Sequence, residues 1–101
     1  MTVAIAVAAL LVACGETNRD KPLSEPGEIL YVLRGNIEAR DAADNLLRVR
    51  HEAIPGFMEA MTMEFSVRGA DVTALPPDGA AVEAKLHVTD HAYWLTDVKS
   101  R

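Results

Sequence analysis

The sequence predicts a small all-β domain, a barrel of five strands, on two observations. Apolar and polar residues alternate in five short segments between residue 28 and the end of the chain, as in strands with one buried face. Turn signals separate these segments, above all at residues 54–56 (Ile-Pro-Gly) and 76–79 (Pro-Pro-Asp-Gly). Because this region has no strong amphipathic helical period, we expect strands joined by turns.

The first two strands are predicted over residues 29–40 and 47–51. In the first, apolar residues and one glycine take the odd positions as far as residue 37, and polar residues take the even positions from residue 34. A turn rich in Asp, Asn and Ala joins the two strands. In the second strand His51 shares the parity of Leu47 and Val49, so we expect its imidazole to face inward at the end of the strand.

The other three strands follow the loop of residues 52–60 and are predicted over residues 61–68, 82–88 and 93–99. Residues 70–75 can form one helical turn between the first two of them. Five short strands of this kind, without a strong amphipathic helix, favour a closed or nearly closed barrel of the OB-like type. The inner face of the strand over residues 61–68 consists of Met61, Met63, Phe65 and Val67.

The amino terminus has the pattern of an export signal. An uncharged apolar run from Val3 to Ala13 has the length of a signal-peptide core and is too short to span a bilayer. It ends in Leu-Val-Ala-Cys-Gly, which resembles the bacterial lipobox, although the residues before the run lack the usual Lys or Arg. We therefore expect removal of residues 1–13, lipidation of Cys14, and, from Gly15, sorting to the outer membrane. Lipidation also explains the lone cysteine; the alternative is a free thiol.

Residues 14–27 are predicted to be the lipidated cysteine and a flexible tether, because this stretch is polar, contains two prolines and has no apolar period. The folded domain is then residues 28–101. The chain carries a formal net charge of −5, all of it after Cys14. An acidic surface disfavours nucleic acid and suits a cation or a basic protein partner.

Three of the four methionines fall within six residues, at positions 58, 61 and 63. Residues two apart in a strand point the same way with Cα atoms roughly 6.5–7 Å apart, so Met61 and Met63 can converge on one ion, and His51 can join them from the preceding strand. Two thioethers and an imidazole suit a soft cation such as Cu(I) or Ag(I) better than zinc, magnesium or calcium. Thioethers also form no disulfides outside the cytoplasm.

Spacing alone leaves a second interpretation open. Methionine often fills cores, so Met61 and Met63 can equally be packing residues of a buried strand, and His51 a satisfied histidine at a strand end. On that interpretation the protein is a structural or interaction lipoprotein without a metal.

The segment from His51 to Phe65, HEAIPGFMEAMTMEF, resembles the CusF-like periplasmic copper-binding proteins and the related domain attached to some Sco-type copper proteins. The resemblance extends from about Tyr31 to the WLTDV segment at residues 94–98. It implies a five-stranded OB-like barrel that binds Cu(I) or Ag(I) through one histidine and two methionines, with a tryptophan over the metal. The ligand roles then fall to His51, Met61 and Met63.

The resemblance breaks down at the metal-capping tryptophan. Met58 occupies the capping position, three residues before the first ligand methionine, and the loop is one residue shorter than in tryptophan-bearing members. Met58 is therefore a candidate fourth ligand or a shield, and Phe57 is a candidate aromatic cover.

The function that we expect is that of a monomeric metallochaperone in copper homeostasis. It would pass the ion to a periplasmic efflux adaptor or to an assembly factor for a copper enzyme, and three donors would leave the site open for ligand exchange. We expect no enzymatic activity, because no nucleophile elbow, phosphate loop, zinc-type spacing or carboxylate pair is found in the sequence. His87 and His91 are predicted to face solvent, and Trp94 to lie in the core or at a barrel end.

Overall fold

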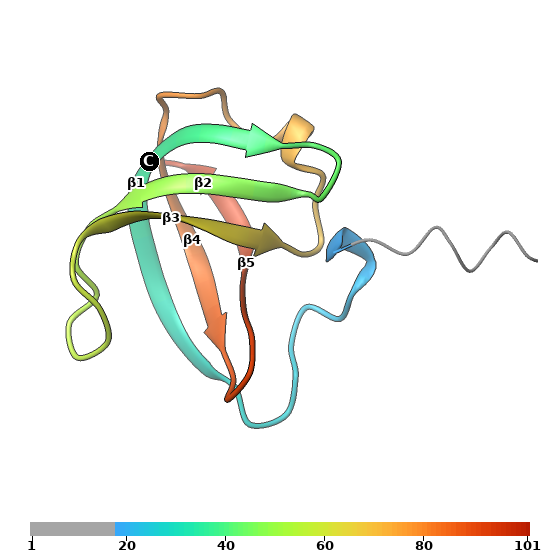
Figure 1. Ribbon diagram of the computed structural model, residues 1–101, viewed down its shortest axis with the longest axis vertical. Helices are drawn as coiled ribbons and strands as arrows, with labels where there is room; N and C mark the ends of the chain where they lie inside the picture. Colours follow the sequence, from blue (N-terminus) through green and yellow to red (C-terminus); the bar gives the residue numbers. More distant parts are fainter. Residues whose placement is uncertain (1–17) are drawn as a thin grey trace, which may run out of the picture.

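The computed structural model describes residues 18–101, and its five strands close into a barrel (Figure 1). Two single turns of 3-10 helix, η1 (Asn18–Asp20) and η2 (Val72–Ala74), complete the regular structure of this part of the chain. The prediction of a small all-β barrel of five strands is therefore confirmed. The strands are β1 (Ile29–Asp41), β2 (Leu46–His51), β3 (Met61–Val67), β4 (Ala81–Val88) and β5 (Tyr93–Ser100).

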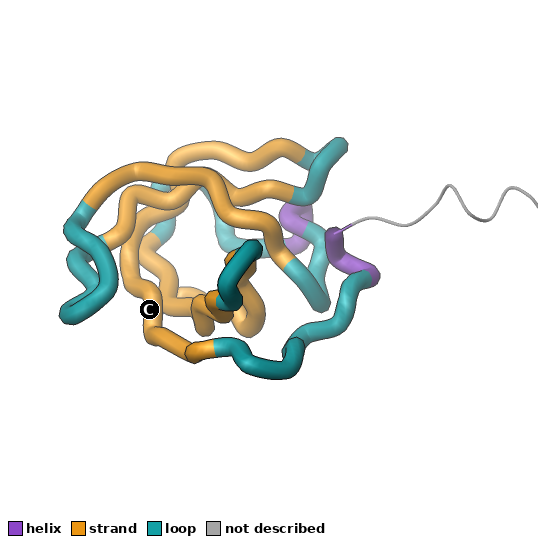
Figure 2. The backbone as a smooth tube through the Cα atoms, turned by 60° about the horizontal axis from the view of Figure 1, so that its bottom comes forward, coloured by secondary structure: helices purple, strands orange, loops and turns teal. Residues whose placement is uncertain are grey.

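The barrel closes in the order β1-β2-β3-β5-β4 (Figure 2). The long strand β1 makes this possible, because its first part pairs with β4 and its second part pairs with β2, both antiparallel. The closing contact is the parallel pairing of β3 with β5, which consists of two residue pairs, Ser66↔Trp94 and Val67↔Leu95. The barrel is therefore weakly closed on one side, between β3 and β5.

Gly35 lies where β1 passes from one neighbour to the other. It is paired with Val82 on β4 and with His51 on β2. A Cβ at this position would lie 2.7 Å from the His51 Cα and would clash with the Arg50 carbonyl oxygen. The absence of a side chain at Gly35 thus lets β1 approach β2 closely, and this approach fixes the position of His51.

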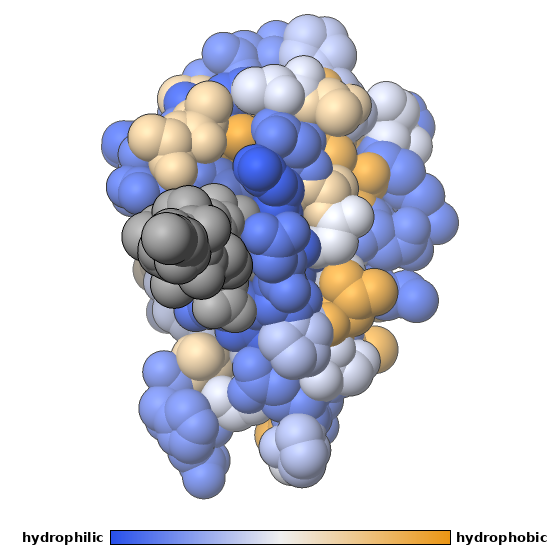
Figure 3. Space-filling model, turned by 90° about the vertical axis from the view of Figure 1, so that its right-hand side faces the viewer, coloured by the Kyte–Doolittle hydropathy of each residue, from blue (hydrophilic) through white to orange (hydrophobic). Residues whose placement is uncertain are grey.

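Apolar side chains of all five strands fill the barrel, as the alternation predicts. The inward parity fails at the first residues of β1, β3 and β5, where Ile29, Met61 and Tyr93 are exposed. On the face shown in Figure 3 hydrophilic residues predominate and apolar residues form small separate patches. The core includes Leu33, Ile37, Leu47, Val49, Phe65, Val67, Val82, Leu86 and Leu95.

Residues 19–28, which we call the strap, lie against the barrel, although the sequence predicts a flexible tether as far as residue 27. The Gly69 N–H donates to the Arg19 carbonyl, and the Trp94 indole N–H donates to the Leu23 carbonyl. The buried Arg68 pairs with Glu25 at 2.6 Å and stacks over Trp94 with its guanidinium carbon 3.7 Å from the ring centroid. A polar segment is thus ordered by partners that it meets only in the folded barrel.

The strap also accounts for the one histidine whose position is predicted wrongly. His87 is 3% exposed, not solvent-facing. Its Nδ1–H donates to the Glu28 carboxylate at 2.9 Å, its Nε2 is hydrogen-bonded to the Thr96 hydroxyl at 2.7 Å, and its ring stacks on Trp94. The outward parity of His87 is correct, but the strap and Trp94 cover that outer face. His91 is exposed and Trp94 is buried, as predicted.

The predicted signal peptide and Cys14 lie outside the described residues. Among residues 18–101, no helix has both the length and the apolar character needed to cross a membrane.

Candidate metal centre

The imidazole of His51 is buried with one of its two nitrogens unpartnered. The side chain is 2% exposed, at the end of β2 and on the inner face, as predicted. Its Nδ1 lies 2.7 Å from the carbonyl oxygen of Glu52. Because a carbonyl only accepts, Nδ1 carries the hydrogen and Nε2 of the neutral ring presents a lone pair. Nε2 is buried and makes no hydrogen bond to any residue from 18 to 101.

The pairing of β2 with β3 places both candidate methionines on the same face as this imidazole. His51 is paired with Met61, and Val49 is paired with Met63. The Glu52 N–H donates to the Arg34 carbonyl on β1, so by alternation the N–H and C=O of His51 point to β3. His51 and Met61 are thus a hydrogen-bonded pair, with Cα atoms about 5.5 Å apart in standard geometry.

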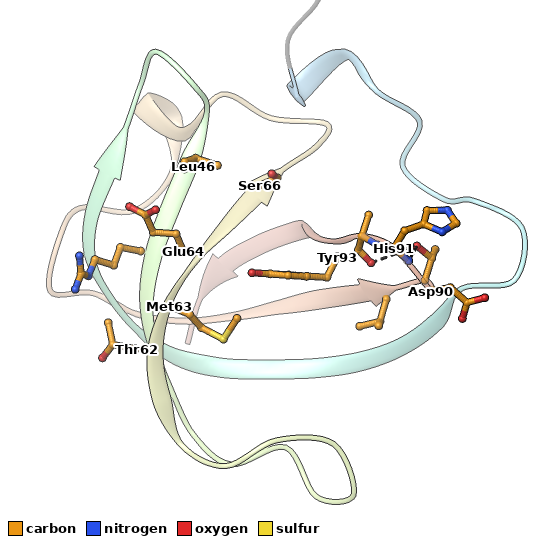
Figure 4. A pocket seen from close by; sticks show the side chains of 12 residues that line it. Leu46, Thr62, Met63, Glu64, Ser66, Asp90, His91 and Tyr93 are labelled. Atoms are coloured by element: carbon orange, nitrogen blue, oxygen red, sulfur yellow. Dashed lines mark hydrogen bonds between the residues drawn. The ribbon is translucent and has the colours of Figure 1, made fainter.

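The two methionines differ in burial. Met61, at the start of β3, is 48% exposed, whereas Met63 is half-buried and packs against the core. In Figure 4 the Met63 side chain points from β3 toward the hairpin between β4 and β5. The three candidate ligands at one mouth of the barrel therefore differ in exposure: the His51 nitrogen is buried, Met63 is half-buried and Met61 is exposed.

The surroundings of His51 are apolar and aromatic. Its ring meets Phe65 edge-on, with centroids 5.9 Å apart, and Phe65 meets Tyr93 in the same way at 5.7 Å. Within residues 18–101 no group of three or more His, Cys, Asp or Glu side chains is arranged to hold a metal. This environment fits a monovalent soft cation held by neutral donors better than a divalent ion that needs carboxylates.

The loop between His51 and Met61 folds back on itself. Ile54 and Met58 form an isolated bridge, and the N–H groups of Phe57 and Met58 both donate to the Ile54 carbonyl. Phe57 stacks face to face on Tyr31, with centroids 4.5 Å apart. Met58 is half-buried and packs against the core. The structure thus places Phe57 on Tyr31, and ligation by Met58 stays a prediction.

The strands and the site together define a class: a small closed β-barrel with imidazole and thioether side chains at one mouth. A family model described as "Copper binding periplasmic protein CusF" matches residues 30–100. This match covers more than half of the sequence, and the chain therefore belongs to the CusF family of periplasmic copper-binding proteins.

Solved structures agree with the family in fold. Apo-CusF from Escherichia coli superposes with a TM-score of 0.66 at 18% identity, over 80% of this chain and 98% of that one. CusF with Ag(I), also from Escherichia coli, superposes with a TM-score of 0.64 at 17% identity, over 77% of this chain and 99% of that one. No curated protein matches this chain by sequence.

Two features of the site have no signal in the sequence. One is the Glu52 carbonyl that fixes the His51 tautomer, since any residue supplies a backbone oxygen. The other is the approach of Gly35 to His51, which becomes visible only when the register of β1 and β2 is known.

Proposed function

We propose that this protein binds Cu(I) or Ag(I) through the Nε2 of His51 and the thioether sulfurs of Met61 and Met63. It then acts as a metallochaperone in the periplasm. The cargo ion is bound reversibly and handed on without a change in oxidation state. Membership of the copper-binding CusF family supports the choice of ion.

The observation that carries the proposal is the buried, unpartnered Nε2 of His51. A buried polar atom without a hydrogen bond costs roughly 1–3 kcal/mol, and such atoms are rare in folded proteins. A metal ion at Nε2 removes this cost, because the lone pair then has a partner. The hydrogen bond from Nδ1 to the Glu52 carbonyl also fixes the orientation of the ring, as a hydrogen bond at the other ring nitrogen does for metal-ligating histidines.

The exposure of Met61 argues against the alternative in which both methionines only pack the core. A methionine that is 48% exposed, next to a buried histidine, contributes little to a core. Met63 does pack against core residues, so packing and ligation are both consistent with its position.

Lipidation at Cys14 and attachment to the outer membrane complete the proposal. They rest on the lipobox-like sequence around Cys14. The partner would be a periplasmic efflux adaptor or an assembly factor for a copper enzyme. The acidic surface, with a formal net charge of −5, would attract a basic docking face.

Thermal unfolding of the full chain with Ag(I), or with Cu(I) under reducing conditions, tests the proposal. A ligand present at a hundred times its Kd should stabilise the fold by about 2.7 kcal/mol. The matched control is the Met61→Leu/Met63→Leu variant, which conserves side-chain volume, so its metal-free stability should stay within about 1.5 kcal/mol of wild type. Absence of stabilisation in the wild type, or equal stabilisation in the control, would refute the proposal.

Met58→Leu tests whether Met58 supplies a fourth ligand, which would be the third sulfur of the site. If Met58 is a ligand, its loss lowers the affinity for Ag(I) at least about tenfold, as removal of one strong contact should. An affinity within about threefold of wild type assigns Met58 to packing. X-ray absorption at the silver edge, which counts sulfur neighbours, gives an independent answer for the same variant.

A further inference from the structure

Strand β3 has an unpaired edge next to the candidate metal ligands. Within the described residues β3 pairs with β5 only at Ser66 and Val67, so the edge of residues 61–65 that faces away from β2 has no strand beside it. Met61 and Met63 direct their backbone groups toward β2 by the alternation derived above. The N–H and C=O groups of Thr62 and Glu64 therefore point to the open side.

A groove of about 900 Å³ lies along this edge, between β3 and the hairpin that joins β4 to β5. Met63 and Tyr93 line its inner part, and Asp90 and His91 line it at the hairpin tip (Figure 4). Tyr93 is 44% exposed, so an aromatic ring stands open beside the Met63 thioether. The groove thus combines free backbone hydrogen-bonding groups, an apolar wall and one proposed metal ligand.

We infer that this groove docks an extended segment of the protein that receives the metal, which pairs with β3 at Thr62 and Glu64 and brings a thioether side chain to Met63. This inference rests on the proposed function. The free N–H and C=O groups select an extended backbone, since only a strand offers donors and acceptors at the matching spacing.

The charges in the groove select the composition of that segment. Glu64 on β3 and Asp90 on the hairpin have no ion-pair partner among residues 18–101, and Arg48 is the one fixed positive charge of the lining. Two carboxylates against one guanidinium, in a chain of formal net charge −5, complement a segment with a positive charge.

Docking at this edge also gives the ion a short path. A side chain of the docked strand that points into the barrel opening lies beside Met63, across the β3 edge. Its sulfur can then bind the ion while Met63 or Met61 releases it, so that the ion passes by ligand exchange and keeps its charge. The sulfur–aromatic contact with Tyr93 would hold the incoming thioether in place.

Amide hydrogen exchange by NMR on the full chain tests the inference with a defined probe, the peptide Lys-Val-Met-Val-Met-Lys. At saturating peptide the N–H groups of Thr62 and Glu64 should exchange at least about tenfold more slowly, because they become hydrogen-bonded. The peptide with Glu in place of both Lys should bind about tenfold more weakly. Replacement of both Met by norleucine should leave docking to the metal-free protein within about threefold.

Thr62→Pro removes the N–H that points to the open side and leaves the hydrogen bonds between β3 and β2 intact. It should lower the affinity for the peptide about five- to tenfold. Thr62→Val, which keeps the amide, is the matched control and should bind as wild type does. Both variants should keep the affinity for Ag(I) within about threefold of wild type, since Thr62 is not a proposed ligand. If Thr62→Pro does not fold, exchange in the wild type alone still decides the matter.

Two results would overturn the inference: unchanged exchange at Thr62 and Glu64 with saturating peptide, or equal peptide binding by Thr62→Pro and Thr62→Val. Protection that rises with protein concentration in the absence of peptide would also overturn it, because the edge would then pair with a second copy. Failure of Ag(I) to stabilise the protein refutes the proposed function separately, since docking is measured without metal.

Discussion

Two regions of the barrel each hold a buried histidine, and the two side chains differ in their partners. Under the strap, on the outer face of β4, both nitrogens of His87 are hydrogen-bonded, to Glu28 and to Thr96, and its ring stacks on Trp94. On the inner face, at the end of β2, His51 has one satisfied nitrogen and one without a hydrogen bond to any residue from 18 to 101. The two residues are almost equally buried, at 3% and 2% exposure.

This difference separates a structural site from a binding site better than residue type or burial does. A fully partnered histidine is completed by the fold itself, and its removal leaves other groups unsatisfied. A histidine with a free lone pair, beside an exposed thioether, is completed only by something from outside. The region under the strap should therefore determine stability, and the mouth at His51 should determine affinity for the metal.

The largest effect on stability is expected in the region under the strap. Trp94→Ala removes a fully buried indole and its bond to the Leu23 carbonyl, and should lower the free energy of unfolding by about 3–5 kcal/mol. Urea unfolding of the metal-free protein measures this. Ag(I) affinity of the folded fraction should stay within about threefold of wild type. A larger loss of affinity would show that the region under the strap and the mouth at His51 are coupled.

His51→Leu should greatly lower the affinity for Ag(I) and change the stability of the metal-free protein little. Affinity for Ag(I) should fall at least about 100-fold, which corresponds to about 2.7 kcal/mol, because the one nitrogen donor is lost. The stability of the metal-free protein should change by less than about 1 kcal/mol, since the substitution removes an unsatisfied buried atom. Competition with a chromophoric Ag(I) chelator measures the first quantity. The exposed His91→Leu is the control, and equal affinities for these two variants would contradict the assignment.

His87→Leu should destabilise the metal-free protein by about 2 kcal/mol, because it leaves the Thr96 hydroxyl buried without its partner and removes the stack on Trp94. Thermal unfolding of His87→Leu and of His51→Leu, both without metal, compares the two histidines directly. If the two variants were equally stable without metal, the contrast between a partnered and an unpartnered imidazole would lose its energetic basis.

The smallest effect is expected for Glu28→Gln, and it depends on pH. The N–H of Glu25, and next the His87 side chain, hold the pKa of Glu28 below its usual value of 4.5. The ionised carboxylate therefore contributes stability above pH 4.5, and this contribution is lost as the pH falls through the lower value of the folded protein. Glu28→Gln should be less stable than wild type at pH 7, and the difference should narrow below pH 4.5 in urea titrations. A difference that stays constant down to pH 3 would exclude this linkage.

Alternation in the sequence is sufficient to predict the five strands and the inward position of His51, because one buried face leaves a period of two. It cannot predict the burial of His87, since the strap that covers the outer face there is polar and has no period of its own. The pairing of His51 with Met61 and of Val49 with Met63 places the three proposed ligands on one face of β2 and β3, and their joint role as ligands stays a prediction. The sequence does not predict the free edge of β3, because this edge depends on how few residues close the barrel against β5.

The first contact of the strap also limits the distance between the barrel and the proposed lipid anchor at Cys14. With Cys14 acylated, as proposed, five residue steps separate the lipid anchor from the first backbone contact, at Arg19 and Gly69, a span of at most about 18 Å. Gly69 lies just beyond the last residue of β3, whereas Met61 begins that strand, about 20 Å away. The barrel would then stay close to the bilayer, with its metal mouth directed away from the lipid. A recipient protein would have to approach this mouth from the side that faces away from the membrane.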